Sequence, residues 1–245
     1  MFTGVYEIAG QAVQIDTVCE RTHRSCRHYR AQWLEPRIFI STSQVDMEEE
    51  KVLLGKVPKT ANTRFAENYL EYLAVQRKRS LELLSHDVLL FHGSALAVDN
   101  QAYIFTAPSG TGKSTHARLW REMLGDRVVM VNDDKPFIRI TPEGAQVYGS
   151  PWNGKHHLST NTHVPLRAIC ILERDVTNHI QEIRPEEAFD TFFHQAFIPR
   201  EPQLRLKALS LLDLLCQHIR IYRLGCNMDP QAAQVSFEGM VEGKL

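Results

Sequence analysis

The distribution of apolar and polar residues changes in character near residue 60. Before this point, short apolar runs separated by glycine, proline and charged residues are typical of β-strands. These runs cover residues 5–8, 12–15, 29–34, 37–40 and 52–54. The pattern predicts a small β-rich N-terminal subdomain over residues 1–60.

A single long helix is expected to follow this subdomain. The polar stretch at residues 56–62 reads as a hinge, and Asn62 or Thr63 can cap a helix that runs to about Ser85. We assign residues 61–87 to this connecting helix.

From residue 88 the pattern predicts one larger domain, residues 88–245, in which strands and helices alternate. Apolar runs at 88–91, 95–98 and 102–106 predict three strands, with Asp99-Asn100 as a two-residue turn between the last two. A two-residue turn makes the strands that it joins antiparallel, whereas parallel strands need a longer crossover. Further elements are predicted as strands at 127–131, 137–140, 146–148, 166–172 and 219–224, and as helices at 115–120, 186–195, 203–218 and from about 229. Together they indicate the α/β class, of the α+β kind, with a mixed sheet.

The strand at 102–106 runs into a loop of small residues, Ala107-Pro108-Ser109-Gly110-Thr111-Gly112-Lys113-Ser114, and then into a helix. Wrapping a polyphosphate in backbone N–H groups requires residues without bulk, which Gly110 and Gly112 provide. Lys113 supplies a cation, Ser114 supplies a hydroxyl for Mg²⁺, and the helix directs its positive dipole end at the anion. The sequence therefore predicts a phosphate-binding loop, with Ala107 where the usual motif has glycine. The residues expected to bind the nucleotide are Ser109, Gly110, Thr111, Gly112, Lys113, Ser114 and Thr115.

Two adjacent carboxylates, Asp133 and Asp134, follow the next predicted strand. One can hold a metal ion, directly or through water, while the other accepts a proton from an incoming hydroxyl. A solvated turn is the alternative reading of this Asn-Asp-Asp run. His92 ends the strand before the loop hairpin, and an imidazole beside a polyphosphate can donate a hydrogen bond or tune a carboxylate. The alternative for a lone histidine is a core position.

The loop Ser150-Pro151-Trp152-Asn153-Gly154-Lys155 combines a rigid proline, an aromatic expected to be exposed and a Gly-Lys pair. Exposed ligand-binding loops favour such residues, so Trp152 and Lys155 are candidate substrate contacts. A simple hairpin loop is the alternative.

Composition narrows the choice of partners. The 245 residues carry a formal net charge of -1, which gives no general electrostatic reason to bind nucleic acid or a membrane surface. There is no apolar run of membrane-spanning length and no signal-peptide pattern, and five scattered cysteines favour free thiols in a reducing cytoplasm. We therefore expect a cytoplasmic protein.

The order and spacing of His92-Gly93, the loop at 109–115 and Asp133-Asp134 resemble the catalytic domain of HPr serine kinase/phosphorylase. They resemble more distantly the ATP-dependent phosphoenolpyruvate carboxykinases. The resemblance covers about residues 88–225 and implies the mixed-sheet P-loop fold of these families. The loop at 149–157 occupies the region where HPr kinases have a later metal-binding glutamate, so the resemblance leaves phosphorylase activity and HPr as substrate open.

The resemblance also implies roles for individual residues. Gly110, Gly112 and Lys113 would hold the phosphates of ATP, and Ser114 would hold Mg²⁺. Asp133 and Asp134 would divide the base and metal roles, with Asp133 favoured as the base and Asp134 as the metal ligand, and His92 would support the pair.

Our first hypothesis is an ATP- and Mg²⁺-dependent kinase that transfers a phosphoryl group to a hydroxyl of a peptide, a protein or a small molecule. Its catalytic residues would be His92, Lys113, Asp133 and Asp134. An ATP-sensing binding protein with little turnover is the alternative, and a carboxykinase-like lyase is a third. The sequence leaves the acceptor open, and also whether the chain forms a homo-oligomer.

Overall fold

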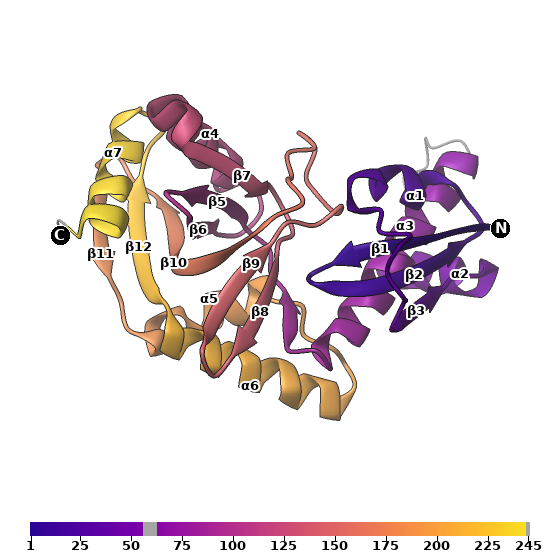
Figure 1. Ribbon diagram of the computed structural model, residues 1–245. Helices are drawn as coiled ribbons and strands as arrows, with labels where there is room; N and C mark the ends of the chain where they lie inside the picture. Colours follow the sequence, from indigo (N-terminus) through magenta and orange to yellow (C-terminus); the bar gives the residue numbers. More distant parts are fainter. Residues whose placement is uncertain (56–62, 244–245) are drawn as a thin grey trace. The chain divides into compact units, whose positions relative to one another are not determined.

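The computed structural model describes residues 1–55 and 63–243, and the chain divides into two compact units, Met1–Ser85 and His86–Leu245 (Figure 1). In the N-terminal unit, β1 (Phe2–Ile8) pairs antiparallel with β2 (Gln11–Thr17), and β3 (Ile38–Ser41) runs parallel to β2. Buried residues largely alternate along these strands, as a sheet covered on one face requires. The helices of this unit are α1 (Arg21–Ser25), a 3₁₀ turn (Arg27–Tyr29), α2 (Gln44–Leu54) and α3 (Thr63–Leu84).

A buried carboxylate ties α3 to the rest of the N-terminal unit. Glu71 is fully buried and accepts hydrogen bonds from the backbone N–H groups of Val18 and Cys19 at 2.6 and 2.7 Å. The Thr42 hydroxyl donates a third at 2.8 Å. Three donors offset the desolvation of the carboxylate, so the helix is held by polar as well as apolar contacts.

Two of the strands predicted for this unit are wrong. Residues 52–54 are apolar but exposed, and they form the last turn of α2. The helix begins after Ser43, whose N–H donates to the Asp46 carboxylate at 2.8 Å, and it ends at Gly55 in the left-handed conformation. These two caps define a helix whose last apolar residues, 52–54, do not face a core.

Residues 29–34 form a turn and a loop instead of the predicted strand. The chain makes one antiparallel bridge to β1 through Arg30 and then turns, with the Leu34 N–H bonded to the Ala31 carbonyl at 3.0 Å. The helix predicted after the hinge is confirmed as α3, whereas the predicted hinge at 56–62, with Asn62 as a cap, lies outside the described residues.

The C-terminal unit is built on a curled mixed sheet (Figure 1). Its strands in the described residues are β4 (Val88–Leu90), β5 (Ser94–Val98), β6 (Gln101–Thr106), β7 (Val128–Asn132), β8 (Phe137–Thr141), β9 (Gly144–Tyr148), β10 (His163–Arg174), β11 (His179–Glu182) and β12 (Arg220–Cys226). They follow the order β4-β8-β9-β10-β6-β5-β7, with β12 on β10 and β11 on β12. The long strand β10 pairs antiparallel with β9 and then parallel with β6 and β12. The predicted mixed sheet of the α/β class is confirmed.

The hairpin before the phosphate loop is also confirmed. β5 and β6 are antiparallel and are joined by Asp99 and Asn100, whose φ angles are 49° and 60°. Positive φ at both positions is the type I′ geometry, whose twist matches that of the flanking strands. β11 was not predicted, because this strand is mostly exposed and has no apolar alternation.

The helices of this unit are α4 (Lys113–Leu124), α5 (Pro185–Gln195), α6 (Pro202–His218) and α7 (Gln231–Phe237). They lie where the sequence predicts helices. No helix in the described part of the chain is both long and apolar enough to cross a membrane.

A buried hydroxyl joins α4 to α7. Ser236 is fully buried, and its Oγ lies 2.8 Å from Trp120 Nε1 and 2.9 Å from His116 Nε2. Ser236 itself donates to the Ala233 carbonyl at 3.0 Å. Burial lowers the pKa of His116 to about 4, so the ring is neutral at pH 7. These contacts therefore attach α4, the helix that follows the phosphate loop, to α7.

We expect Ser236→Ala to lower the free energy of unfolding by about 1–3 kcal/mol, because the buried Trp120 N–H loses its acceptor and the buried His116 Nε2 loses its hydrogen-bond partner. Urea denaturation followed by tryptophan fluorescence measures this change. Ser210→Ala is the control, since that exposed hydroxyl donates only to the Leu206 carbonyl of its own helix; we expect it to change stability by about 0.5 kcal/mol or less. Equal effects of the two substitutions would show that Ser236 has no special role.

Candidate active site

The phosphate-loop residues connect the end of β6 to the start of α4. Gly110 and Gly112 have φ angles of 83° and 132°, conformations that residues with a Cβ rarely adopt. Gly112 is the N-cap of α4, and its carbonyl accepts the His116 N–H at 2.9 Å. The first N–H groups of α4 have no partner within the helix, so they and the helix dipole favour an anion at this end.

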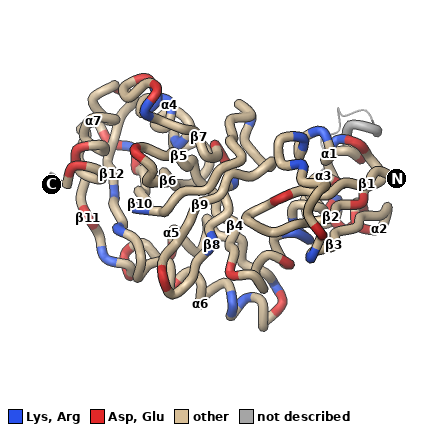
Figure 2. The backbone as a smooth tube through the Cα atoms, in the orientation of Figure 1, with Lys and Arg blue, Asp and Glu red and all other residues tan. Residues whose placement is uncertain are grey.

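A cavity of about 690 Å³ opens at this end of α4. All the predicted nucleotide-binding residues line it except Thr111, whose hydroxyl donates to the Pro108 carbonyl at 2.9 Å. Figure 2 marks Lys and Arg positions in blue along the backbone of α4. The ionised groups on the cavity wall are Lys113, Arg118, Arg121, Lys155, Asp133 and Asp134. The excess of cations suits a polyanionic ligand.

Lys113 lies inside the loop that precedes it. Its Nζ donates to the carbonyl oxygens of Ala107 and Pro108 at 2.7 and 3.4 Å, and the residue is 8% exposed. Burial lowers the pKa of Lys113, and the negative charge of Asp134 opposes this change. The ammonium is thus held close to the position from which it can reach a bound phosphate.

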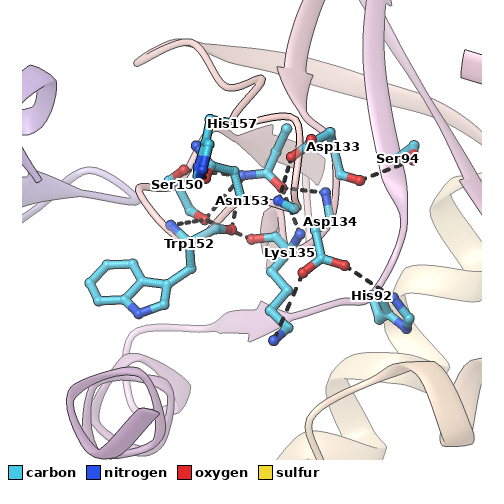
Figure 3. Close-up of polar contacts among 11 residues, drawn as sticks. His92, Ser94, Asp133, Asp134, Lys135, Ser150, Trp152, Asn153 and His157 are labelled. Carbon is cyan, nitrogen blue, oxygen red and sulfur yellow. Dashed lines mark hydrogen bonds and ion pairs between the residues drawn. The ribbon is translucent and has the colours of Figure 1, made fainter. Parts of the chain in front are cut away.

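Asp133 and Asp134 follow β7 and line the same cavity (Figure 3). Asp133 Oδ1 accepts the Gly154 N–H at 2.6 Å, while its buried Oδ2 has no hydrogen-bond partner among the described residues. Asp134 Oδ1 lies 3.2 Å from His92 Nε2, and Oδ2 lies 3.9 Å from Lys135 Nζ. The four side chains predicted to be catalytic, including Lys113, therefore surround one cavity.

The surroundings of the two carboxyl groups shift their pKa values in opposite directions. Burial raises the pKa of Asp133, the charge of Asp134 adds to the rise, and backbone hydrogen bonds, including that from Gly154, offset it only in part. Burial also tends to raise the pKa of Asp134, but the His92 hydrogen bond and nearby positive charges outweigh it and lower that pKa. Asp134 is therefore the more firmly ionised group, and Asp133 is the better proton acceptor.

Asn132 shapes the turn that carries both aspartates, and the sequence reading did not single it out. Its Oδ1 accepts the N–H groups of Asp134 and Lys135 at 2.9 and 2.6 Å. Its Nδ2 donates to the Ser150 carbonyl at 3.0 Å and lies 3.3 Å from the Trp152 carbonyl. This fully buried amide fixes the turn and the facing loop together. An asparagine at a strand end is a signal for such an Asx turn, and the sequence contained it.

His92 is held by its backbone at the end of the β4 segment. Its N–H donates to the Gln195 carbonyl at 2.7 Å, and its carbonyl accepts the Thr106 hydroxyl at 2.8 Å. The adjacent Gly93 N–H donates to the Asp134 carbonyl at 3.0 Å. The side chain is one-third exposed and lines the cavity, so the core position considered as an alternative does not apply.

The loop at residues 150–157 forms the wall opposite α4. Gly154, Lys155 and His156 line the cavity, so Lys155, which was predicted to contact a substrate, lies at the cavity wall. The expectation that Trp152 is exposed is wrong: it is 1% exposed and is not part of the cavity lining. Figure 3 shows its indole directed away from the two aspartates. Bonds from its backbone to Ser150 and Asn132 fix this orientation, and burial favours so large an apolar surface.

Three arginines near the loop were not among the site residues predicted from the sequence. Arg118 and Arg121 lie on the first turns of α4 after the motif and line the cavity. Arg174, at the end of β10, donates to the Gly110 carbonyl at 2.5 Å. The period of α4 could have indicated the first two, whereas Arg174 reaches the loop only through the pairing of β10 with β6.

Two side chains in the cavity are of the kind that can ligate a magnesium ion. Ser114 and Asp134 both line it, and they offer a hydroxyl and an ionised carboxylate. In residues 1–55 and 63–243 no cluster of three or more His, Cys, Asp or Glu is suited to a metal ion. Mg²⁺ in such sites is held by one or two protein oxygens together with phosphate and water, so these residues fit it.

Comparison with known proteins gives little beyond the structure itself. No family model matches the chain, and no curated protein matches it. Among solved structures, the chain is similar to the HPr(Ser) kinase/phosphatase from Coxiella burnetii, with 10% sequence identity over 64% of this chain and 99% of that chain and a TM-score of 0.34.

We expect Asn132→Asp to lower the free energy of unfolding by about 2–3 kcal/mol. The substitution keeps Oδ1 but places a second oxygen against the carbonyl oxygens of Ser150 and Trp152. Thermal and urea unfolding measure the loss. Asn153→Asp is the matched control, because Asn153 Nδ2 donates to the rotatable Ser159 hydroxyl instead of to buried carbonyl groups, and the substitution keeps the Oδ1 that contacts His157. A stability equal to that of the control would contradict the role assigned to Asn132.

The two aspartates should respond oppositely to replacement by asparagine. The raised pKa of Asp133 means that its stabilising contribution is present at low pH and is lost as the pH rises through the folded-state pKa. The lowered pKa of Asp134 means that its contribution is present at neutral pH and is lost as the pH falls through the folded-state pKa. At pH 7, Asp133→Asn should therefore raise the melting temperature, and Asp134→Asn should lower it.

Thermal unfolding of both variants and the wild type between pH 7 and pH 4 tests this pair. The rise in melting temperature caused by Asp133→Asn should become smaller as the pH falls, because protonation of Asp133 removes the same buried negative charge in the wild type. Two shifts of the same sign at pH 7 would contradict the assignment.

Proposed function

We propose that this protein is a kinase that transfers the terminal phosphoryl group of ATP, with Mg²⁺, to a hydroxyl group. The observation that carries the proposal is the arrangement of Asp133 and Asp134 across one cavity from Lys113 and the start of α4. The two carboxyl groups have pKa values shifted apart. Phosphoryl transfer requires mainly positioning, charge neutralisation and one proton acceptor, and this set of groups can provide them.

In this proposal the loop and α4 bind the polyphosphate. Gly110 and Gly112 allow backbone N–H groups to approach it, and Lys113 contributes its charge to the terminal phosphates. Ser114 and Asp134 would hold Mg²⁺, which when bound neutralises phosphate charge. Asp134 is suited to this role because its surroundings keep it ionised.

We assign the nucleoside to a second cavity of about 480 Å³ beside the loop. This cavity shares Gly110, Gly112 and Thr115 with the phosphate-binding cavity. Its further lining includes the apolar side chains of Leu119 and Leu172, as a nucleobase site requires. The shared residues make the two cavities adjacent, which supports assigning the nucleoside and its phosphates to neighbouring parts of one site.

Asp133 is assigned as the general base. Its carboxylate takes the proton of the acceptor hydroxyl while that oxygen forms a bond to the γ-phosphorus. The bond from the γ-phosphorus to the bridging oxygen breaks, and ADP leaves with the electron pair. His92 donates to Asp134 and keeps it oriented beside the base. The acceptor, a hydroxyl of a peptide, a protein or a small molecule, would enter along the wall of Gly154, Lys155 and His156.

We expect Asp133→Asn to retain ATP binding and to reduce phosphoryl transfer by about 10²–10⁴-fold, the range that loss of a general base produces. Calorimetry measures ATP binding. Transfer from γ-labelled ATP to a panel of serine and threonine peptides and small polyols measures the reaction. Lys113→Ala is the control for the binding arm and should lose ATP affinity.

The outcomes separate a kinase from a nucleotide sensor. Saturable ATP binding by the wild type without transfer to any member of the panel would favour an ATP-sensing binding protein. Transfer that is undiminished in both Asp133→Asn and Asp134→Asn would exclude the proposed mechanism.

A further inference from the structure

The carbonyl groups of the phosphate loop are held by identifiable donors. Those of Ala107 and Pro108 accept from Lys113 Nζ, and that of Pro108 also accepts from Thr111. The carbonyls of Gly110 and Thr111 both accept from Arg174. The loop is thus supported by one cation from inside, Lys113, and by a second from outside its own sequence.

Arg174 reaches the loop through the sheet. β10 runs parallel to β6, and Ile171 is paired with Thr106, the last residue of β6. Arg174 follows three residues beyond that pair and is therefore level with the loop. Its Nη2 donates to the Gly110 carbonyl at 2.5 Å, and its Nε donates to the Thr111 carbonyl at 3.5 Å. The planar guanidinium presents several donors in a fixed fork, so it can serve two neighbouring carbonyls at once.

Holding a carbonyl on one side of a peptide plane directs the N–H of the same plane to the other side. The Thr111 carbonyl and the Gly112 N–H share one peptide plane. Arg174 holds the carbonyl outward, and Gly112 lines the phosphate-binding cavity. Arg174, which does not line the phosphate-binding cavity, thereby orients the N–H group of Gly112, which does. Gly112 has a φ of 132°, a conformation that is open to glycine because it has no Cβ.

The two cations differ in what a ligand would do to them. A phosphate that attracts Lys113 draws its ammonium away from the Ala107 and Pro108 carbonyls. Arg174 does not line the phosphate-binding cavity, so its contacts with the Gly110 and Thr111 carbonyls can persist while phosphates are bound there. Arg174 is therefore the support that remains when Lys113 is engaged.

We propose that Arg174 is a positioning residue of the phosphate site: it fixes the Gly110 and Thr111 carbonyls so that the loop presents its N–H groups to a polyphosphate. It acts on the phosphates through the backbone, since Arg174 itself does not line the phosphate-binding cavity. This inference rests on the proposed binding of ATP at this loop and adds a residue that the motif does not contain.

Arg174→Gln tests the inference, with ATP and inorganic tripolyphosphate as the probes. We expect the Kd of both probes, and the KM for ATP, to rise about five- to tenfold, the effect of losing one or two hydrogen bonds from a loop. The kcat should stay within about twofold of the wild type, because the aspartates are untouched. Arg174→Lys should recover part of the affinity, since an ammonium can reach one carbonyl but does not match the fork.

Arg167→Gln is the matched control, because Arg167 is an exposed arginine on the same strand and its loss changes the net charge equally. It should leave both dissociation constants unchanged. An equal loss in this control, or no loss in Arg174→Gln, would overturn the positioning role while leaving the proposed function intact. A loss for ATP but not for tripolyphosphate would also overturn it, since Arg174 lines the nucleoside cavity and would then be a nucleoside contact. A wild-type protein that binds neither probe would overturn the proposed function itself, and this inference with it.

Discussion

The geometry of the site depends on the hydrogen bonds of one buried amide. Asn132 accepts two N–H groups from the turn that carries the aspartates and donates to the loop that faces them. Because that loop supplies the Gly154 N–H to Asp133, the amide also determines how the Asp133 carboxyl group is held. A side chain with both a donor and an acceptor is needed here, since the groups around it are carbonyls on one side and N–H groups on the other.

The same arrangement buries the carboxyl group of Asp133, and this burial is unfavourable for the stability of the fold. Asp133 is 6% exposed, and its Oδ2 has no partner among the described residues. A natural chain retains a buried acid of this kind when the pKa shift that destabilises the fold is also useful for proton transfer. Asp134, one residue on, has a histidine and a lysine beside it and is stabilised as an anion. Adjacent residues of the same type thus have different chemistry because their neighbours differ.

Much of the C-terminal unit could be predicted from the sequence, and less of the N-terminal unit. The strands and helices after residue 88 have clear apolar periods and turn signals, and β11 was missed because it is a short, exposed strand at the edge of the sheet. In the N-terminal unit, residues 52–54 looked like a strand because they are apolar, yet capping at Ser43 and Gly55 places them in an exposed helical turn. Apolar sequence indicates burial only on average, and local caps decided the outcome here.

The candidate site also has a part that could be predicted from the sequence and a part that could not. The phosphate loop and the aspartate pair are each a short continuous segment of the sequence, so their residue types alone suggested their chemistry. Asn132 and Arg174 act through partners that are remote in the chain, and their roles follow only from strand pairing and loop packing. The burial of Trp152 likewise depends on how its loop folds back, which its neighbours in the sequence do not reveal.

The type I′ turn at Asp99 and Asn100 also bears on the order in which the protein folds. β6, the strand that carries the phosphate loop, has a partner close in sequence in β5. Its other neighbour, β10, is far along the chain, with pairs such as Ala102 and Leu166. Closing a two-residue turn loses far less chain entropy than closing so long a segment. The β5–β6 hairpin can therefore form before β10 is in place, as a template on which the remaining strands assemble. The phosphate loop would then be anchored at one end early in folding, while the support from Arg174 arrives only with the docking of β10.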